Sequence, residues 1–241
     1  MGGVSGFRTI LFDRNGAVAH VTLNRPSVLN AYDLQMRDDL FTAFTAVRDD
    51  PTLRVVVIRG KGRAFCSGGD IREFGTAPSP VVAREVRWRR DVWGLLRGLS
   101  KLTIAAVHGH AAGSGMEIAL LCDFRIAATN AVFSLPETAI GMIPGVVGTQ
   151  TAPRVLGEGR ALELVLAGKR IDARLALRIG LVDSVVPVEK LDPAARRLAK
   201  RLAAIDPQLA AAAKDLVVRG SDLPLDAALA RERLAARRTN R

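Results

Sequence analysis

Cysteine is scarce in this 241-residue chain, which contains only Cys66 and Cys122 and no Cys-x-x-Cys pair. Two cysteines cannot cross-link a chain of this length, so a disulfide-stabilised scaffold is excluded. The lack of paired cysteines also removes the usual signature of a zinc site. We therefore expect both thiols to be reduced, in a reducing compartment.

Targeting and membrane signals are also missing. Residues 1–13 contain no apolar stretch long enough for a signal peptide, and Gly6 stands where an N-myristoylation motif requires Ser or Thr. The longest uncharged stretches, residues 102–116 and 138–153, are interrupted by Gly or Pro and are too short to span a bilayer. These absences predict a cytoplasmic protein that does not enter a membrane.

Two kinds of ligand motif are absent as well. The Gly-x-x-x-x-Gly-Lys-Ser/Thr spacing of a phosphate-binding loop does not occur. His20, His108 and His110 have no acid or cysteine at metal-ligand spacing. We therefore predict no metal site and expect His108 and His110 to be loop or packing residues.

The overall composition is that of a folded protein, and the chain carries an excess of positive charge. Apolar residues make up 49% and charged residues 24%, enough for one large domain with a sizeable core. The 35 Lys and Arg residues exceed the 24 Asp and Glu residues, which gives a net charge of +11. This charge suits an anionic partner such as nucleic acid, an acidic surface or a phosphorylated ligand. A solvated basic surface would give the same composition.

The hydrophobic pattern predicts strands that alternate with helices. The expected strands are 9–13, 17–23, 55–58, 103–107, 123–127 and 181–186, and the expected helices are 34–49, 80–99, 113–121, 160–167 and 173–179. Such alternation is typical of α/β architecture. An Ala-, Leu- and Arg-rich sequence from Leu191 onward predicts a helical segment, 191–241, after a core spanning 1–190.

Residues 102–153 contain only four formal charges, Glu117, Asp123, Arg125 and Glu137. The average charge density of the chain would place about twelve in these 52 residues. Such a stretch is mostly buried or lines a cavity. Because an ionised carboxylate resists desolvation, carboxylates persist there when they are paired or when a raised pKa is useful.

Glu117 follows Gly113, Ser114 and Gly115 at the predicted start of a helix. The glycines allow a ligand to approach the backbone, and the N–H of Ser114 points outward at the helix N-terminus. Glu117 lies three residues after Ser114 on the same helix face, so an anion-binding N–H and a carboxylate would face one spot. Alternatively, Glu117 is a buried ion-pair partner of Arg125.

Glu137 follows Pro136, which fixes the chain direction, and precedes Gly141 and Gly145, which permit sharp turns. Its position in the same charge-poor stretch makes it a second candidate acid. Alternatively, Glu137 is an N-cap or first-turn acid of a short helix.

A third candidate segment, residues 64–71, follows the buried strand predicted at 55–58. Ligands of α/β folds gather at such strand ends, and the adjacent Gly68 and Gly69 permit unusual φ angles and expose a backbone N–H. Asp70 could instead cap the next segment, which would make this loop a structural turn.

These segments together resemble the crotonase superfamily, and within it the enoyl-CoA hydratases. The resemblance covers residues 7–238 and depends on the order and spacing of several motifs. These are Leu23-Asn24-Arg25-Pro26 with Leu29-Asn30-Ala31, Ala64–Ile71, Gly109–Asp123 and Phe133–Gln150. The implied fold is a crotonase-like spiral of ββα turns followed by a C-terminal helical module.

The resemblance also implies a site. The N–H groups of Gly69 and Ser114 would form an oxyanion hole for a thioester carbonyl, and Glu117 and Glu137 would be the catalytic acids. The implied substrate-binding residues are Leu29, Ala31, Gly69, Asp70, Ile71, Arg72, Gly113 and Gly145. Coenzyme A would be part of the substrate, with no further cofactor, and the assembly would be a homotrimer or a dimer of trimers.

Three features depart from the family pattern. Ser114 stands where glycine is common, and Ser27 stands where lysine is frequent. The Glu-Gly-x-x-Ala-Phe pattern of the family's last helix, which often helps to cover the coenzyme A site, is not found.

The expected activity is the reversible addition of water to a 2-trans-enoyl-CoA. An isomerase, hydratase-lyase or hydrolase of the same superfamily is the alternative, although the presence of both glutamates favours hydration. A basic homologue that binds RNA is an alternative of another class, and we do not expect nucleic acid to be the partner.

Overall fold

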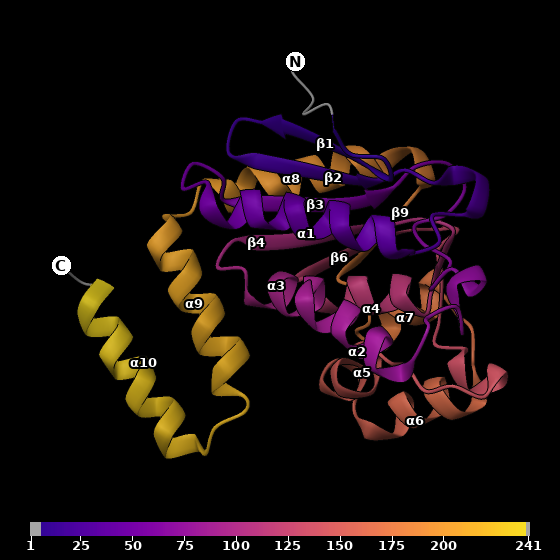
Figure 1. Cartoon of the computed structure of the whole chain (residues 1–241). Helices are drawn as coiled ribbons and strands as arrows, with labels where there is room; N and C mark the ends of the chain where they lie inside the picture. The colour runs from indigo at the N-terminus through magenta and orange to yellow at the C-terminus, as the bar shows by residue number, and fades with distance from the viewer. Residues whose placement is uncertain (1–5, 240–241) are drawn as a thin grey trace.

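The computed structural model of the protein describes residues 6–239. The strands of its larger sheet are β1 (Ile10–Asn15), β2 (Val18–Leu23), β3 (Val55–Gly60), β4 (Leu102–Val107), β6 (Phe124–Ala128) and β9 (Ser184–Val186). They lie in the order β1-β2-β3-β4-β6-β9, with β1 antiparallel to β2 and the other neighbours parallel (Figure 1). All six strands were predicted, so the α/β class is confirmed.

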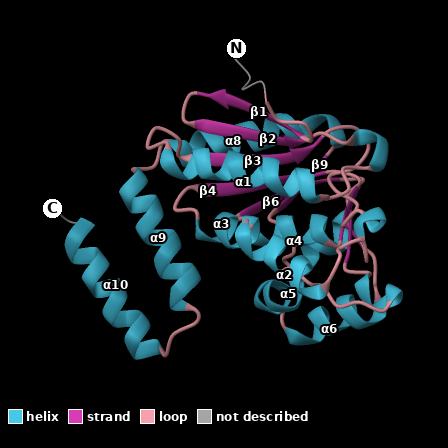
Figure 2. Ribbon diagram, viewed as in Figure 1, coloured by secondary structure: helices cyan, strands magenta, loops and turns pink. Residues whose placement is uncertain are grey.

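Helices cover both faces of this sheet (Figure 2). The helices are α1 (Leu34–Asp49), α2 (Pro80–Arg89), α3 (Val92–Gly98), α4 (Ser114–Leu121), α5 (Gly148–Leu156), α6 (Glu158–Ala167), α7 (Ala173–Arg178), α8 (Leu191–Ala203), α9 (Pro207–Gly220) and α10 (Leu225–Thr239). Short 3-10 helices are η1 (Pro26–Val28), η2 (Ile71–Glu73), η3 (Glu137–Ile140) and η4 (Val188–Lys190). Because α1 packs on one face and α8 on the other, every residue of β2 is buried.

A second, smaller sheet was not predicted. Its strands are β5 (His110–Ala112), β7 (Val132–Ser134) and β8 (Ile171–Asp172), with β7 in the centre. Strands of two or three residues are too short to show a period-2 pattern. This sheet is important for the site because β5 leads directly into α4 and β7 directly into η3.

The prediction of one helix over residues 80–99 is wrong. The chain forms two helices, α2 and α3, with Asp91 between them. The Asp91 side chain accepts the N–H of Gly94 at 2.8 Å and so begins a new helix.

The C-terminal segment is helical, as predicted from Leu191 onward. Helix α8 lies against the sheet, whereas α9 and α10 form a pair that extends away from it (Figure 1). Lys214 of α9 forms a half-buried ion pair with Asp123, in which Nζ and Oδ2 are 2.8 Å apart. This pair connects α9 to the core. Within residues 6–239 none of the helices is both long and apolar enough to cross a membrane.

Candidate active site

The loop after β3 is held against strand β5 by backbone hydrogen bonds. The N–H of Cys66 donates to the carbonyl of His110, and the N–H of Ala112 donates to the carbonyl of Cys66, each at 3.0 Å. This pairing brings Gly68 beside Gly113, where a Cβ would lie 3.5 Å from the Gly68 Cα. Gly113 has φ +49°, a conformation that favours glycine.

Two backbone N–H groups beside this contact have no acceptor. The N–H of Tyr32 donates to the carbonyl of Gly68 and the N–H of Asp70 to the carbonyl of Tyr32, both at 2.8 Å, which leaves the N–H of Gly69 unused. Ser114 is the first residue of α4, and the first N–H groups of a helix have no intrahelical acceptor. In the described part of the chain neither N–H forms a hydrogen bond, so both are available to an oxygen of a ligand.

Glu117 lies one turn into α4 and is 1% exposed. Its Oε1 accepts the N–H groups of Val146, Val147 and Gly148 at 3.3, 2.8 and 2.7 Å. These groups belong to the N-terminus of α5, which favours a negative charge. Oε2 accepts no hydrogen bond from residues 6–239 and is left for a ligand or a water molecule.

The alternative ion pair between Glu117 and Arg125 does not form, and that interpretation is wrong. The Nε of Arg125 donates to the carbonyl of Leu181 at 2.7 Å, and Nη1 donates to the carbonyl of Cys122 at 2.5 Å. Arg125 therefore donates hydrogen bonds to a carbonyl at the C-terminal end of α4 and to the carbonyl of Leu181. Glu117 keeps its carboxylate for other chemistry.

Glu137 is the second carboxyl group at this point. It begins η3 as an acid of the first turn, as the alternative interpretation predicted. Its Oε1 would lie 2.7 Å from a Cβ on Gly113, and its Oε2 is buried without a partner in the described residues. Burial raises the pKa of Glu137, and the charge of Glu117 raises it further. The two glutamates therefore share one site, in which Glu137 is poised to hold a proton.

The cysteine in this loop does not supply a nucleophile. Cys66 is fully buried, and burial raises the pKa of its thiol to about 12. A thiol with that pKa is not ionised at neutral pH. Acid–base chemistry by the two glutamates is the chemistry that the arrangement supports.

The remaining predicted substrate-binding residues are distributed around the loop. Leu29 adjoins it, because its carbonyl accepts the N–H of Ser67 at 3.0 Å. Ile71 is 72% exposed. Gly145 lies apart from the Gly68–Gly113 contact, in the loop before α5, where a Cβ would meet the carbonyl of Ile143 at 3.7 Å.

Asp70 and Arg72 form an ion pair at the outer end of the loop. The Arg72 guanidinium donates to both carboxylate oxygens of Asp70, at 2.9 and 2.6 Å. Asp70 also accepts the N–H of Arg72 at 3.2 Å, as the capping alternative predicted. Hydrogen bonds from Arg72, and then from Arg25, hold the pKa of Asp70 well below its ordinary value.

The sequence is similar to those of known proteins over most of its length. A sequence model described as enoyl-CoA hydratase/isomerase matches residues 13–240. The chain is 40% identical to (E)-benzylidenesuccinyl-CoA hydratase of Thauera aromatica, over 87% of this chain and 82% of the relative. The chain belongs to the enoyl-CoA hydratase/isomerase family.

Solved structures show the fold of this family. The crystal structure of enoyl-CoA hydratase from Bacillus anthracis matches with a TM-score of 0.90 and 35% identity, over 95% of this chain and 90% of that one. A Thermobifida fusca structure described as a complex with CoA matches with a TM-score of 0.88 and 33% identity, over 95% and 91%. The crotonase-like fold predicted from the motifs is therefore confirmed.

Some residues of this family member's site were not predicted from the sequence. The N–H groups of residues 146–148 hold Glu117, yet backbone donors leave no trace in residue types beyond Gly145 and Gly148. Arg25 and Asn30 were recognised as motif residues without a role. The half-buried Arg25 and the buried Asn30 each make several hydrogen bonds around the loop.

The raised pKa of Glu137 predicts a pH-dependent effect on the stability of this family member. A carboxyl group whose pKa is raised in the folded state contributes stability below its unfolded pKa, and that contribution is lost as the pH rises through the folded pKa. Glutamine does not ionise. The unfolding free energy of Glu137→Gln relative to wild type should therefore increase between about pH 4 and about pH 8.

Urea unfolding at the two pH values measures this difference. Glu232→Gln, which removes an exposed glutamate on α10, is the control and should show a much smaller change. A Glu137→Gln difference that does not vary with pH would contradict the raised pKa.

Proposed function

We propose that the chain is an enoyl-CoA hydratase that adds water reversibly to a 2-trans-enoyl-CoA, giving a 3-hydroxyacyl-CoA. The observation that carries this proposal is that the N–H groups of Gly69 and Ser114, unpaired among the described residues, and the Glu137 carboxyl group lie around the Gly68–Gly113 contact. The charge of Glu117, on the same helix as Ser114, acts on Glu137. Membership of the family supports it, as does the hydratase activity named for relatives. The reaction requires no metal or redox cofactor.

In this mechanism the thioester oxygen accepts hydrogen bonds from Gly69 and Ser114. These donors stabilise the negative charge that develops on that oxygen when C3 is attacked. Glu117 binds the attacking water through its free Oε2 and takes one of its protons, while the hydroxyl bonds to C3. Protonated Glu137 delivers a proton to C2, and both carboxyl groups then exchange protons with solvent.

The differing environments of the two glutamates suit these roles. Three N–H groups bind Oε1 of Glu117 and fix the orientation of its carboxyl group, which leaves Oε2 for a water molecule. Oε2 of Glu137 has no donor among the described residues, and burial raises the pKa of this group. Glu117 is thus oriented to hold a water molecule, and Glu137 is suited to supply a proton.

Coenzyme A gives the basic charge of the chain a use, because its diphosphate and 3′-phosphate are anionic. Arg72 is a cation at the end of the loop formed by residues 64–71, and its side chain is 64% exposed. Arg25 also binds Asp70, so Arg72 can turn toward a phosphate without leaving that carboxylate unpaired. The pantetheine chain would pass Leu29, Ala31, Asp70 and Ile71 on its way to Gly69.

The assembly proposed is a homotrimer or a dimer of trimers. The α9–α10 pair extends from the core and exposes large apolar side chains, among them Val217, Leu225 and Leu234. Contacts with other copies of the chain would cover this surface. Nucleic acid is not part of the proposal.

The test is a panel of enoyl-CoA thioesters of different chain length and branching, assayed by the loss of conjugated-enoyl absorbance. At least one 2-trans-enoyl-CoA should be hydrated, and free coenzyme A should inhibit while single-stranded RNA at physiological salt should not. Turnover of 3-enoyl-CoA alone would replace hydration by isomerisation. Salt-resistant RNA binding without any turnover would overturn the enzyme assignment.

A further inference from the structure

The backbone of Gly69 is aligned by a neighbouring segment rather than by its own loop alone. Tyr32 and Gly69 form a parallel bridge, made by the hydrogen bonds of Tyr32 to Gly68 and Asp70. The N–H of Ser67 donates to the carbonyl of Leu29 at 3.0 Å. The direction of the Gly69 N–H is therefore set by the conformation of residues 29–32.

That segment adopts a backbone conformation that does not form easily. Leu29 and Asn30 have φ values of +53° and +57°, in the left-handed region that disfavours residues other than glycine. Two consecutive residues of this kind persist only where the surroundings hold them. Asn30 is fully buried and donates to the carbonyls of Ala64 and Phe65 at 2.8 and 3.2 Å, while its Oδ1 accepts the N–H of Arg25 at 2.8 Å.

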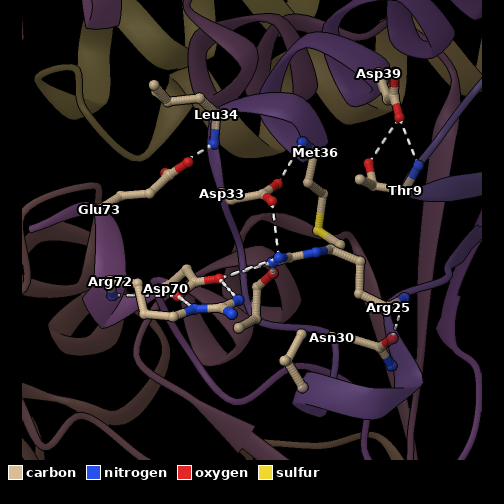
Figure 3. A network of polar contacts seen from close by, with 12 residues as sticks. Thr9, Arg25, Asn30, Asp33, Leu34, Met36, Asp39, Asp70, Arg72 and Glu73 are labelled. Carbon is tan, nitrogen blue, oxygen red and sulfur yellow. Dashed lines mark hydrogen bonds and ion pairs between the residues drawn. The ribbon is translucent and has the colours of Figure 1, made fainter.

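The Arg25 guanidinium also contacts residues on both sides of the Tyr32–Gly69 bridge (Figure 3). Its Nη1 donates to the carbonyl of Ala31 at 2.5 Å and to Asp70 at 3.1 Å, and its Nη2 pairs with Asp33 at 2.9 Å. These three acceptors lie on both partners of the Tyr32–Gly69 bridge. The planar guanidinium thus joins the two backbones through several donors at fixed angles.

Arg25 pairs with a carboxylate on each side of the Tyr32–Gly69 bridge. The side chains of Asp33 and Asp70 are only 13% and 6% exposed, and both pair with Arg25. Arg72 contacts Asp70 from the exposed side, and Asp33 has no ion-pair partner besides Arg25 in the described residues. Without Arg25, Asp70 would keep Arg72, but the half-buried Asp33 would lose its ion-pair partner and the ionic link between the two sides of the bridge would be lost.

We propose that Arg25 is a positioning residue that aims the N–H of Gly69 at the thioester oxygen. It acts through Ala31, Asp33 and Asp70 and does not touch the substrate. This inference rests on the proposed function, since the donor matters only if a thioester binds there. Misaiming one donor, rather than deleting it, should lower kcat about 10- to 100-fold with KM changed little.

Arg25→Met and Arg25→Lys test this, with two readouts. The first is kcat and KM for a short 2-trans-enoyl-CoA. The second is the absorbance of bound 4-(dimethylamino)cinnamoyl-CoA, which shifts to longer wavelength when hydrogen bonds polarise its carbonyl. Arg25→Met should bind this thioester but lose most of the shift, and Arg25→Lys, which keeps the charge without the planar fork, should be intermediate.

Lys214→Met is the matched control, because it removes the half-buried Lys214–Asp123 ion pair, which lies away from the loop. It should keep the spectral shift and have kcat within about twofold of wild type. The proposal would be overturned if Arg25→Met kept the wild-type spectral shift and kcat. It would also be overturned if Arg25→Met and Lys214→Met lost the shift and kcat to the same extent. If Arg25→Met does not fold, wild-type values in Arg25→Lys would overturn it.

The wild-type protein separates this inference from the hydratase proposal. A full spectral shift without hydration of any enoyl-CoA would reject the hydratase but support Arg25, provided that Arg25→Met loses the shift. Neither shift nor turnover in wild type would reject both.

Discussion

Glu117→Gln should lower kcat for hydration by about 10²–10⁴-fold, with little change in the affinity for coenzyme A. The amide oxygen of glutamine can still accept the N–H groups of Val147 and Gly148, so the N-terminus of α5 should stay in place. The variant lacks the carboxylate that takes a proton from water. Steady-state kinetics on the best substrate of the thioester panel, with circular dichroism to verify folding, measures the effect.

Glu137→Gln should cause a loss of the same size for a different reason. The amide holds the shape of the protonated carboxyl group but cannot transfer a proton to C2. The exposed Glu232→Gln variant should retain wild-type kcat. Near-normal turnover in either active-site variant would reject the two-acid mechanism. If Glu137→Gln loses activity on a 3-enoyl-CoA and Glu117→Gln does not, the result would favour an isomerase.

The scarcity of charge in residues 102–153 made Glu117 and Glu137 candidate acids before the family resemblance gave them roles. A carboxylate in such a stretch must have a partner or a function. The same argument could not choose between a task and a partner. Arg125 was a plausible partner by spacing, but helix end carbonyls need donors too, and these carbonyls bind its guanidinium.

Helix α5 shows why backbone donors escaped prediction. It begins at a glycine and contains Pro153, two residues that weaken a helical pattern. Yet its N-terminus holds Glu117 through three N–H groups. The left-handed conformation of Leu29 and Asn30 also escaped prediction, because neither residue type requires a positive φ. Their conformation follows from tertiary hydrogen bonds that no local pattern encodes.

Ser114→Pro should remove the second oxyanion donor while leaving α4 in place, and kcat/KM should fall by about 10²–10³-fold. Ser114 is the first residue of α4, the position at which helices accept proline, because an N–H there has no intrahelical partner. Gly113 lacks a Cβ, which relieves the crowding that proline imposes on the residue before it. The loss would therefore report the missing N–H rather than a broken helix.

Ser114→Gly and Ser114→Ala separate the backbone from the side chain. Both keep the N–H, so both should hydrate short substrates within a few-fold of the wild-type rate, and the glycine variant should accept bulkier acyl groups because it lacks the Cβ. The Ser114 hydroxyl makes no hydrogen bond to any residue in the range 6–239, so its removal should cost little stability. An alanine variant as inactive as the proline variant would show that the hydroxyl takes part in the reaction, and the assignment of the backbone N–H as the donor would then be wrong.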